Sequence, residues 1–155
     1  MKKSFYLIPV LLVLFAGCSS GDDLPDPEPE DKNSVFKVEY SQAGDVGQFY
    51  QDITFYGSPF GWEDTQTGAE VEAHLSSERG TIPESFSYET KQNTAAIWVT
   101  YNVTPHNVGE EISLDVTFKF YQDGKLIDTK NISIDNESTV TDSFEWKYFA
   151  DTGEK

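Results

Sequence analysis

The chain contains a single cysteine, Cys18, among its 155 residues. Because a disulfide needs two cysteines, no intramolecular disulfide can form, and cysteine-rich zinc sites are excluded for the same reason. The two histidines, His74 and His106, lie far apart along the chain and lack metal-ligand spacing. We therefore expect a domain that folds without disulfides and binds no metal or cofactor.

Basic residues are also scarce. The chain has 11 Lys and Arg against 27 Asp and Glu, which gives a formal net charge of −16 at pH 7. Such a charge repels phosphate backbones and anionic lipid surfaces, so it argues against nucleic-acid binding. The same charge keeps an exported domain dispersed in water and need not indicate a cationic partner.

Motifs of several enzyme classes are missing. The sequence has no Gly-x-Ser-x-Gly serine motif, no glycine-rich phosphate loop ending in Gly-Lys-Ser or Gly-Lys-Thr, and no calcium loop of alternating acids. We therefore predict no catalytic residues and expect the protein not to be an enzyme.

Residues 1–17 are typical of a secretory leader. Two lysines are followed by an apolar stretch over residues 5–15 and then by the small pair Ala16 and Gly17, directly before Cys18. The apolar stretch is shorter than the ~20 residues of a membrane-spanning helix and is interrupted by Pro9. A cleaved leader is therefore the better interpretation.

The residues LFAGC at positions 14–18 resemble the lipobox of bacterial lipoproteins, in which a peptidase cuts before a cysteine that is acylated. Phe15 departs from the leucine usual at its position. The resemblance implies a lipidated Cys18 whose acyl chains, such as palmitate, anchor the protein to a membrane. The alternative is an ordinary leader followed by an unpaired thiol, which would be a liability outside the cytoplasm. Cleavage would remove two lysines and no acid, leaving a charge of −16 − 2 = −18.

Residues 18–33 predict a tether. Three prolines alternate with acidic residues, and such a stretch cannot bury enough apolar surface to fold and favours extended polyproline geometry. The acids that follow Cys18 resemble the export signal of surface lipoproteins of Bacteroidota-type bacteria. We expect an exported protein anchored to the outer membrane of the cell envelope, with surface exposure as the further implication of that signal.

Residues 34–149 are typical of one all-β domain, followed by a polar tail at residues 150–155. The clearest strand has apolar residues at every second position: Ile112, Leu114, Val116, Phe118 and Phe120. The pair Asp123-Gly124 favours a two-residue hairpin turn, so residues 126–134 should fold back antiparallel. Similar alternation around residues 36–40, 49–55, 86–88, 97–103 and 144–148 predicts a single antiparallel β-sandwich of seven or eight strands.

The sandwich pattern resembles immunoglobulin-like accessory domains of bacterial surface lipoproteins, although the paired cysteines of antibody-type domains are absent. Residues 68–78 fit two structures. Thr67 with Glu70 has capping-box spacing and would begin a short helix. Ala69, Val71, Ala73 and Leu75 also alternate with polar residues, and we favour the strand because this pattern has more matches.

Aromatic residues gather around a Gly- and Pro-containing loop, with Tyr56, Phe60 and Trp62 as the candidate ligand contacts. Such rings can form a platform on which sugar rings or peptide side chains stack. They can equally plug the end of a sandwich core, and we favour the plug. We expect Trp98 and Trp146, which lie within strands, to pack in the core.

The sequence leads us to expect a non-catalytic binding module for a glycan or a protein at the cell envelope. Two alternatives remain open. One is a structural or assembly subunit of an envelope complex, and the other is a hydrolase that uses scattered carboxylates.

Overall fold

The computed structural model describes residues 33–106, 111–135 and 141–150. The chain divides into two units, Met1–Glu30 and Asp31–Lys155, and all the described residues belong to the second. The predicted leader, Cys18 and nearly all of the tether lie outside the described residues, as do residues 151–155 of the polar tail. In the part of the chain that is described, no helix has the length and apolar character needed to cross a membrane.

Ten strands and one short 3-10 turn occur within the described ranges. They are β1 (Phe36–Gly44), η1 (Val46–Gln48), β2 (Phe49–Tyr56), β3 (Trp62–Asp64), β4 (Glu70–Val71), β5 (His74–Ser76), β6 (Ser85–Thr90), β7 (Ala96–Pro105), β8 (Ser113–Gln122), β9 (Lys125–Asp135) and β10 (Asp142–Phe149).

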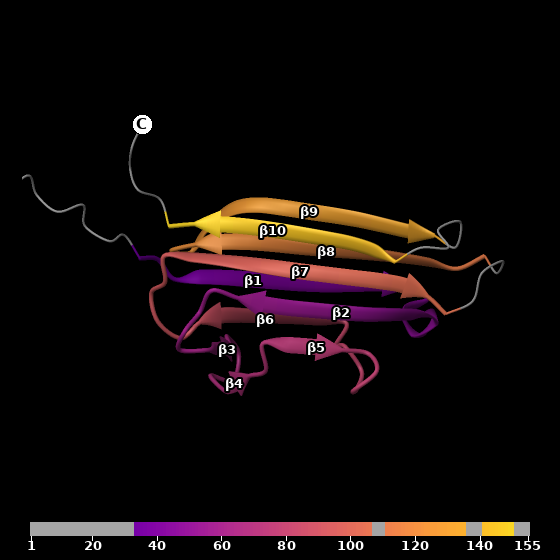
Figure 1. The fold of residues 1–155 in the computed structure, drawn as a ribbon, viewed down its shortest axis with the longest axis horizontal. Coiled ribbons are helices and arrows are strands. Elements are labelled where there is room, and N and C mark those ends of the chain that lie inside the picture. The colour runs from indigo at the N-terminus through magenta and orange to yellow at the C-terminus, as the bar shows by residue number, and fades with distance from the viewer. Residues whose placement is uncertain (1–32, 107–110, 136–140, 151–155) are drawn as a thin grey trace, which may run out of the picture. The chain divides into compact units, whose positions relative to one another are not determined.

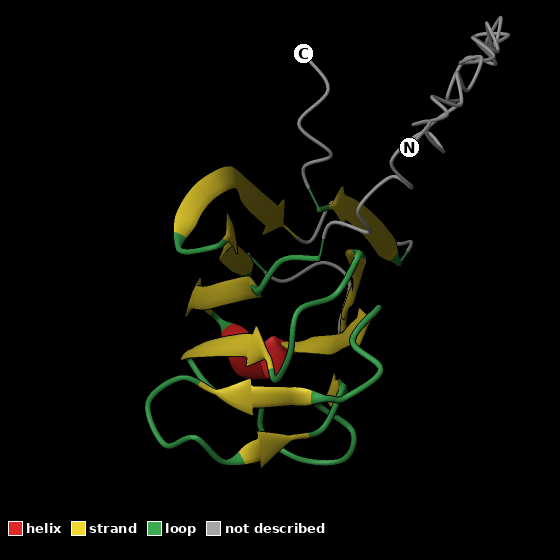
Figure 2. Ribbon diagram, turned by 90° about the vertical axis from the view of Figure 1, so that its left-hand side faces the viewer, coloured by secondary structure: helices red, strands yellow, loops and turns green. Residues whose placement is uncertain are grey.

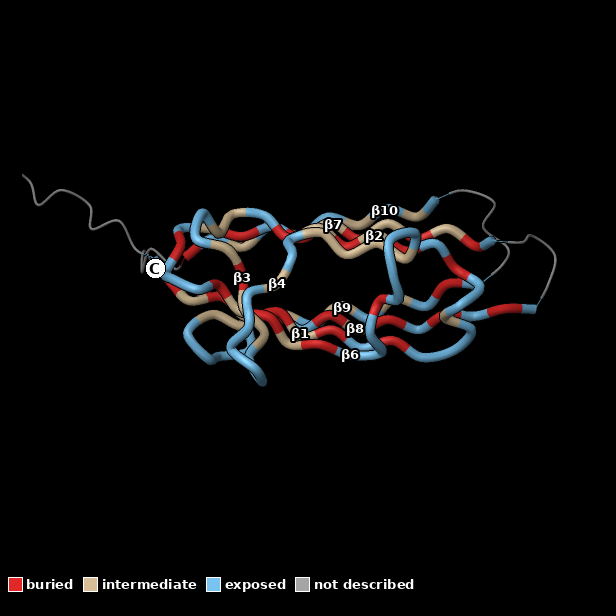
Figure 3. The backbone as a smooth tube through the Cα atoms, turned by 90° about the horizontal axis from the view of Figure 1, so that it is seen from below, coloured by how far each residue is buried: buried red, intermediate tan, exposed pale blue. Residues whose placement is uncertain are grey.

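These strands form two antiparallel sheets that pack face to face (Figures 1 and 3). One sheet has the order β4-β3-β6-β1-β8-β9, and the other has the order β10-β7-β2-β5. The turn η1 carries the chain from β1 in the first sheet to β2 in the second (Figure 2, red). The predicted all-β sandwich is therefore confirmed. The first strand, β1, lies inside its sheet, whereas antibody-type domains have their first strand at an edge.

The predicted hairpin is also confirmed. Strands β8 and β9 pair antiparallel, and Asp123 and Gly124 connect them with φ angles of 49° and 76°. Positive φ at both central residues is the mark of the hairpin turn whose twist matches that of the strands. The predicted apolar face of β8, from Ile112 to Phe120, is buried.

The strand prediction for residues 68–78 is confirmed, but the segment forms two strands rather than one. β4 pairs with β3 in the six-stranded sheet, and β5 pairs with β2 in the four-stranded sheet. The chain therefore crosses between the two sheets at Glu72 and Ala73. This crossing and the short strand β3 account for ten strands where the sequence predicts seven or eight.

A buried polar cluster links the two sheets inside the core. The Gln51 side chain accepts hydrogen bonds from the hydroxyls of Tyr40 and Tyr101, both at 3.0 Å, and donates to Gln42 at 2.9 Å. Gln42 in turn donates to the carbonyl oxygen of Ile82. Burial raises the pKa of both tyrosines, so they remain neutral donors. Because these buried polar groups have hydrogen-bonding partners, they do not destabilise the core.

Candidate aromatic binding face

The outer face of the four-stranded sheet is formed by alternate residues of β2, β7 and β10. The residues between them are buried in β2 and β7 and half-buried in β10, so the outward side chains point to solvent. Along β2 these outward side chains are Tyr50, Asp52, Thr54 and Tyr56. Their partners on β7 are Thr104, Asn102, Thr100 and Trp98. We call this surface the aromatic face, because aromatic side chains stand at its two ends and polar ones between them.

Tyr56 and Trp98 form the first aromatic group of this face. They are direct cross-strand partners, and their rings stack with centroids 5.0 Å apart and planes inclined by 17°. Trp98 nevertheless remains 37% exposed. Such a stack stabilises by about 0.5–1.5 kcal/mol beyond the area it buries. It therefore holds two rings in one orientation while leaving apolar surface in contact with water.

A glycine fixes the chain beside this stack. Gly57 follows Tyr56 with a φ of +92°, a conformation that other residues rarely adopt. A Cβ atom at this position would lie 2.2 Å from the carbonyl oxygen of Ala96. Only glycine therefore allows the end of β2 to approach the start of β7 so closely, and this approach places Tyr56 next to Trp98.

Trp98 also lines a pocket of about 410 Å³ together with Phe149, Lys147 and Glu145. Phe149 ends β10 and is 70% exposed. Single exposed apolar residues carry little meaning, but here several apolar groups line one concavity. The Lys147 ammonium lies 2.7 Å from Glu145 Oε1, and both side chains are about half exposed. The pocket thus combines apolar walls with a charged hydrogen-bonding pair.

The three candidate residues from the sequence are divided between surface and core. Tyr56 belongs to the aromatic face, and Phe60 is 54% exposed in the loop before β3. Trp62 is only 1% exposed, and its ring packs against Phe55 with centroids 5.3 Å apart. Trp62 is therefore a core plug, and its candidate role in ligand contact is wrong.

Trp98 requires the opposite correction, because the sequence led us to expect it in the core. Its neighbours Ile97 and Val99 are buried, and strict alternation places Trp98 on the other side of the sheet. Trp146 does pack against the core, with its ring centroid 4.9 Å from that of Phe118. Alternation along β10 also places Phe149 outward, a position that its sequence signal, the end of an alternating strand, would have indicated.

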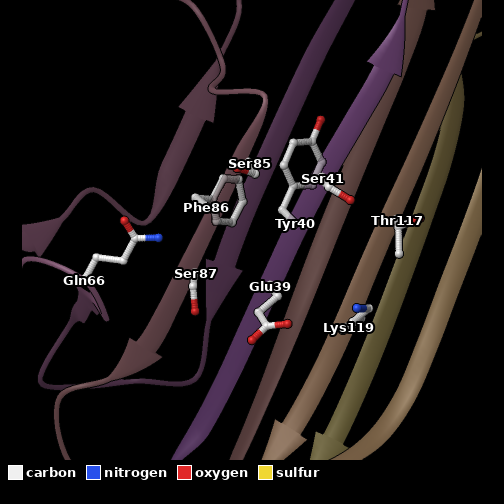
Figure 4. Close-up of a pocket in the computed structure, with 9 residues that line it drawn as sticks. All are labelled: Glu39, Tyr40, Ser41, Gln66, Ser85, Phe86, Ser87, Thr117 and Lys119. Atoms are coloured by element: carbon white, nitrogen blue, oxygen red, sulfur yellow. The ribbon is translucent and has the colours of Figure 1, made fainter.

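A second concavity, of about 290 Å³, lies on the outer face of the six-stranded sheet (Figure 4). Its one carboxylate, Glu39, is already paired. Lys37 donates to Glu39 Oε1 at 2.6 Å, and the Tyr121 hydroxyl donates to Glu39 Oε2 at 2.8 Å. Burial alone would raise the pKa of Glu39, but these hydrogen bonds outweigh it and lower the pKa below its usual range. With both oxygens engaged, this carboxylate is poorly placed for proton transfer.

The described residues contain no group of three or more His, Cys, Asp or Glu side chains arranged to hold a metal ion. His74 Nε2 lies 3.0 Å from Asp52 Oδ1 on the aromatic face. His106 packs against Tyr50, with ring centroids 3.9 Å apart. The two histidines therefore contact different residues of β2, at Asp52 and Tyr50.

Neither a family model nor a curated protein matches this chain. Solved structures do share its fold. A DUF4425 domain of unknown function from Bacteroides vulgatus ATCC 8482 aligns with a TM-score of 0.64 and 17% identity, covering 76% of this chain and 97% of that one. A DUF4425 family protein from Bacteroides ovatus ATCC 8483 has a TM-score of 0.63 and 14% identity, covering 79% and 98%.

A third similar structure is the calcium-bound form of a protein from Parabacteroides distasonis, determined by NMR. It has a TM-score of 0.65 and 21% identity, covering 80% of this chain and 98% of that one. At these identities the likeness shows the fold alone. The chain thus has a β-sandwich found in Bacteroides and Parabacteroides proteins, which fits the resemblance to Bacteroidota-type proteins.

Proposed function

We propose that this protein is a non-catalytic glycan-binding module, held at the cell envelope by acyl chains on Cys18. The observation that carries the proposal is the exposed Tyr56–Trp98 stack beside the pocket that Trp98 and Phe149 line. Water-exposed rings in a concavity gain free energy when a ligand covers them, at about 25 cal/mol per Å² of apolar surface removed from water.

A sugar ring matches this arrangement. Its C–H faces are apolar and pack on aromatic rings, while the hydroxyls at its rim need hydrogen-bonding partners. Glu145 can accept such bonds and Lys147 can donate them, and the two lie in the same pocket as Trp98. Apolar walls with a few polar groups are the usual composition of a small-ligand site.

The binding experiment uses the mature chain from residue 18 with Cys18→Ser, so that no detergent is needed. A glycan array identifies ligands, and calorimetry measures their affinity. We expect Trp98→Ala and Phe149→Ala each to weaken binding about tenfold, which corresponds to 1.4 kcal/mol. Leu126→Ala, which removes an exposed apolar side chain from the other sheet, is the matched control.

Two outcomes would contradict the proposed site. Affinity that is unchanged in Trp98→Ala would exclude the aromatic face, and a loss confined to Phe60→Ala would move the site to the loop before β3. The array is run with calcium and with a chelator, because one structural neighbour is described as calcium-bound. Binding that needs calcium would add an ion to the proposed function.

The anchor is tested separately from the binding site. Cells expressing the wild type should incorporate a fatty acid analogue into the protein, and Cys18→Ala should remain unlabelled. The labelled protein should fractionate with the outer membrane, and protease added to intact cells tests surface exposure. Equal labelling of the two proteins would refute the lipid anchor without affecting the glycan site.

A second candidate function, a subunit of an envelope complex, is favoured by one edge of the sandwich. β9 is an edge strand of 11 residues, and Leu126 and Ile127 near its start are exposed. Edge strands offer unpaired backbone groups to a neighbouring strand. Co-purification of an envelope protein at fixed stoichiometry, lost when Ile127 is replaced by Lys, would support this role over glycan binding.

A further inference from the structure

The aromatic face has a second ring pair at the opposite end of β2. The ring centroids of Tyr50 and His106 lie 3.9 Å apart, and Tyr50 is 48% exposed. Tyr50 and Tyr56 are six positions apart on one strand, both on its outer side. At about 3.3 Å per residue, roughly 20 Å separates the two aromatic groups. This span is larger than one sugar ring and suits an extended ligand.

The surface between the two aromatic groups is polar. Direct cross-strand pairs place Thr54 beside Thr100 and Asp52 beside Asn102. Hydroxyl and amide groups both donate and accept hydrogen bonds, the ionised carboxylate accepts them, and at this face all three point to solvent. A chain of sugars lying along β2 would therefore meet rings at each end and hydrogen-bonding groups between them.

At the Tyr50 end lies a cation that has no ion pair among the described residues. Tyr50 and His106 line a pocket of about 510 Å³ that also contains Arg79 and Glu78. Arg79 is the only arginine in the chain, and its guanidinium forms no ion pair with any described carboxylate, although the chain has 27 acids. A guanidinium matches a carboxylate through two parallel hydrogen bonds. An arginine that pairs with no described carboxylate is available to an anionic ligand.

We propose that the aromatic face binds a linear glycan that carries carboxylates, such as a uronic-acid polymer, along β2. One sugar packs on Trp98, and a carboxylate further along the chain pairs with Arg79 beside Tyr50. This proposal rests on the proposed function and specifies its ligand. Glu78 in the same pocket supplies an acceptor for sugar hydroxyls. Its negative charge repels any further ligand carboxylate beyond the one that pairs with Arg79. The net charge of −16 repels anionic polymers at long range, so their recognition depends on these short-range contacts.

The test compares oligogalacturonides and oligomannuronates with their carboxyl-reduced counterparts, from disaccharides to hexasaccharides. The mature Cys18→Ser chain is used at physiological ionic strength, where screening over about 8 Å limits long-range repulsion. We expect at least one uronate series to bind about tenfold more tightly than its reduced form, and affinity to rise with length. Tyr50→Ala should weaken hexasaccharide binding and leave disaccharide binding unchanged.

Arg79→Gln is the decisive variant. It should abolish the preference for the acidic form while leaving affinity for the reduced form unchanged. Lys119→Gln removes the same charge from the other sheet and should change neither affinity. An acid preference that survives Arg79→Gln, no preference in the wild type, or affinity independent of length would overturn the inference. Binding of reduced glycans that still depends on Trp98 would then leave the proposed function intact, whereas no glycan binding at all would refute both.

Discussion

The two outer faces of the sandwich differ in how their side chains are partnered. On the six-stranded sheet, Lys37 and Tyr121 both donate to Glu39, and the Lys37 ammonium lies 4.0 Å from the centroid of the Tyr121 ring. On the four-stranded sheet, Trp98 stacks on Tyr56 but stays exposed, and Phe149 is largely exposed. Groups that satisfy one another gain little from a ligand, whereas exposed rings gain when they are covered. The contrast explains why we place binding on the four-stranded sheet.

The largest expected effect is a difference in stability between two variants, one that truncates a tryptophan of the core and one that truncates a tryptophan of the aromatic face. Trp62→Ala should lower the free energy of unfolding by about 3–5 kcal/mol, because it opens a cavity in the core. Trp98→Ala should cost clearly less than Trp62→Ala, since the Trp98 side chain is already 37% exposed and its removal opens no cavity in the core. Urea denaturation of both variants measures this difference. Equal losses would show that Trp98 serves stability, and the contrast between the faces would then weaken.

The next effect concerns the polar cluster that joins the two sheets. Gln51→Ala should cost about 2–4 kcal/mol, because the hydroxyls of Tyr40 and Tyr101 and the amide of Gln42 lose a buried partner. Tyr101→Phe, which removes only one of these bonds, is the control and should cost about 1 kcal/mol. If denaturation gives the same loss for both variants, Gln51 is not the centre of the cluster.

The smallest effect is expected on the six-stranded face. The pKa of Glu39 lies below its ordinary value of 4.5 in the folded protein, so its ionised form favours folding. This contribution is fully present above about pH 4.5 and is lost as the pH falls through the lower folded-state pKa. Because the pair is near the surface, we expect at most about 1 kcal/mol.

Urea denaturation of the wild type and Glu39→Gln between neutral pH and about pH 3 measures this contribution. The difference between the two proteins should shrink as the pH falls, and glycan affinity at neutral pH should be equal. A difference that stays constant with pH would show that ionisation of Glu39 contributes nothing to stability. Weaker glycan binding in Glu39→Gln would place a ligand contact on the six-stranded face. The assignment of binding to the four-stranded sheet alone would then be wrong.

The strands that the sequence predicts best are those with local signals. In β8 and β9, alternation defines the buried face, and Asp123-Gly124 defines the turn, so both signals lie within one continuous segment. The outward position of Trp98 follows from the same alternation, because Ile97 and Val99 are buried. The general tendency of tryptophan to pack in cores pointed the other way, and the local pattern proved the better guide.

Other features depend on contacts between distant segments. The sequence favours Trp62 as a core plug but does not name its partner, and only the structure shows that its ring packs on Phe55 of the opposite sheet. Residues 68–78 alternate as one strand would, yet β4 and β5 belong to different sheets. No local pattern specifies which sheet a short strand joins, because its hydrogen-bonding partners come from elsewhere in the chain.

The sequence by itself determined the all-β class, the β8–β9 hairpin and which side of each long strand is apolar, because period-two alternation is a property of neighbouring residues. It also supplied the expectation of an anchor at Cys18. Only the tertiary structure placed Trp98 beside Tyr56, and Arg79 in one pocket with Tyr50 and His106. These groups come from separate segments, and strand pairing between those segments, which no single segment encodes, brings them together.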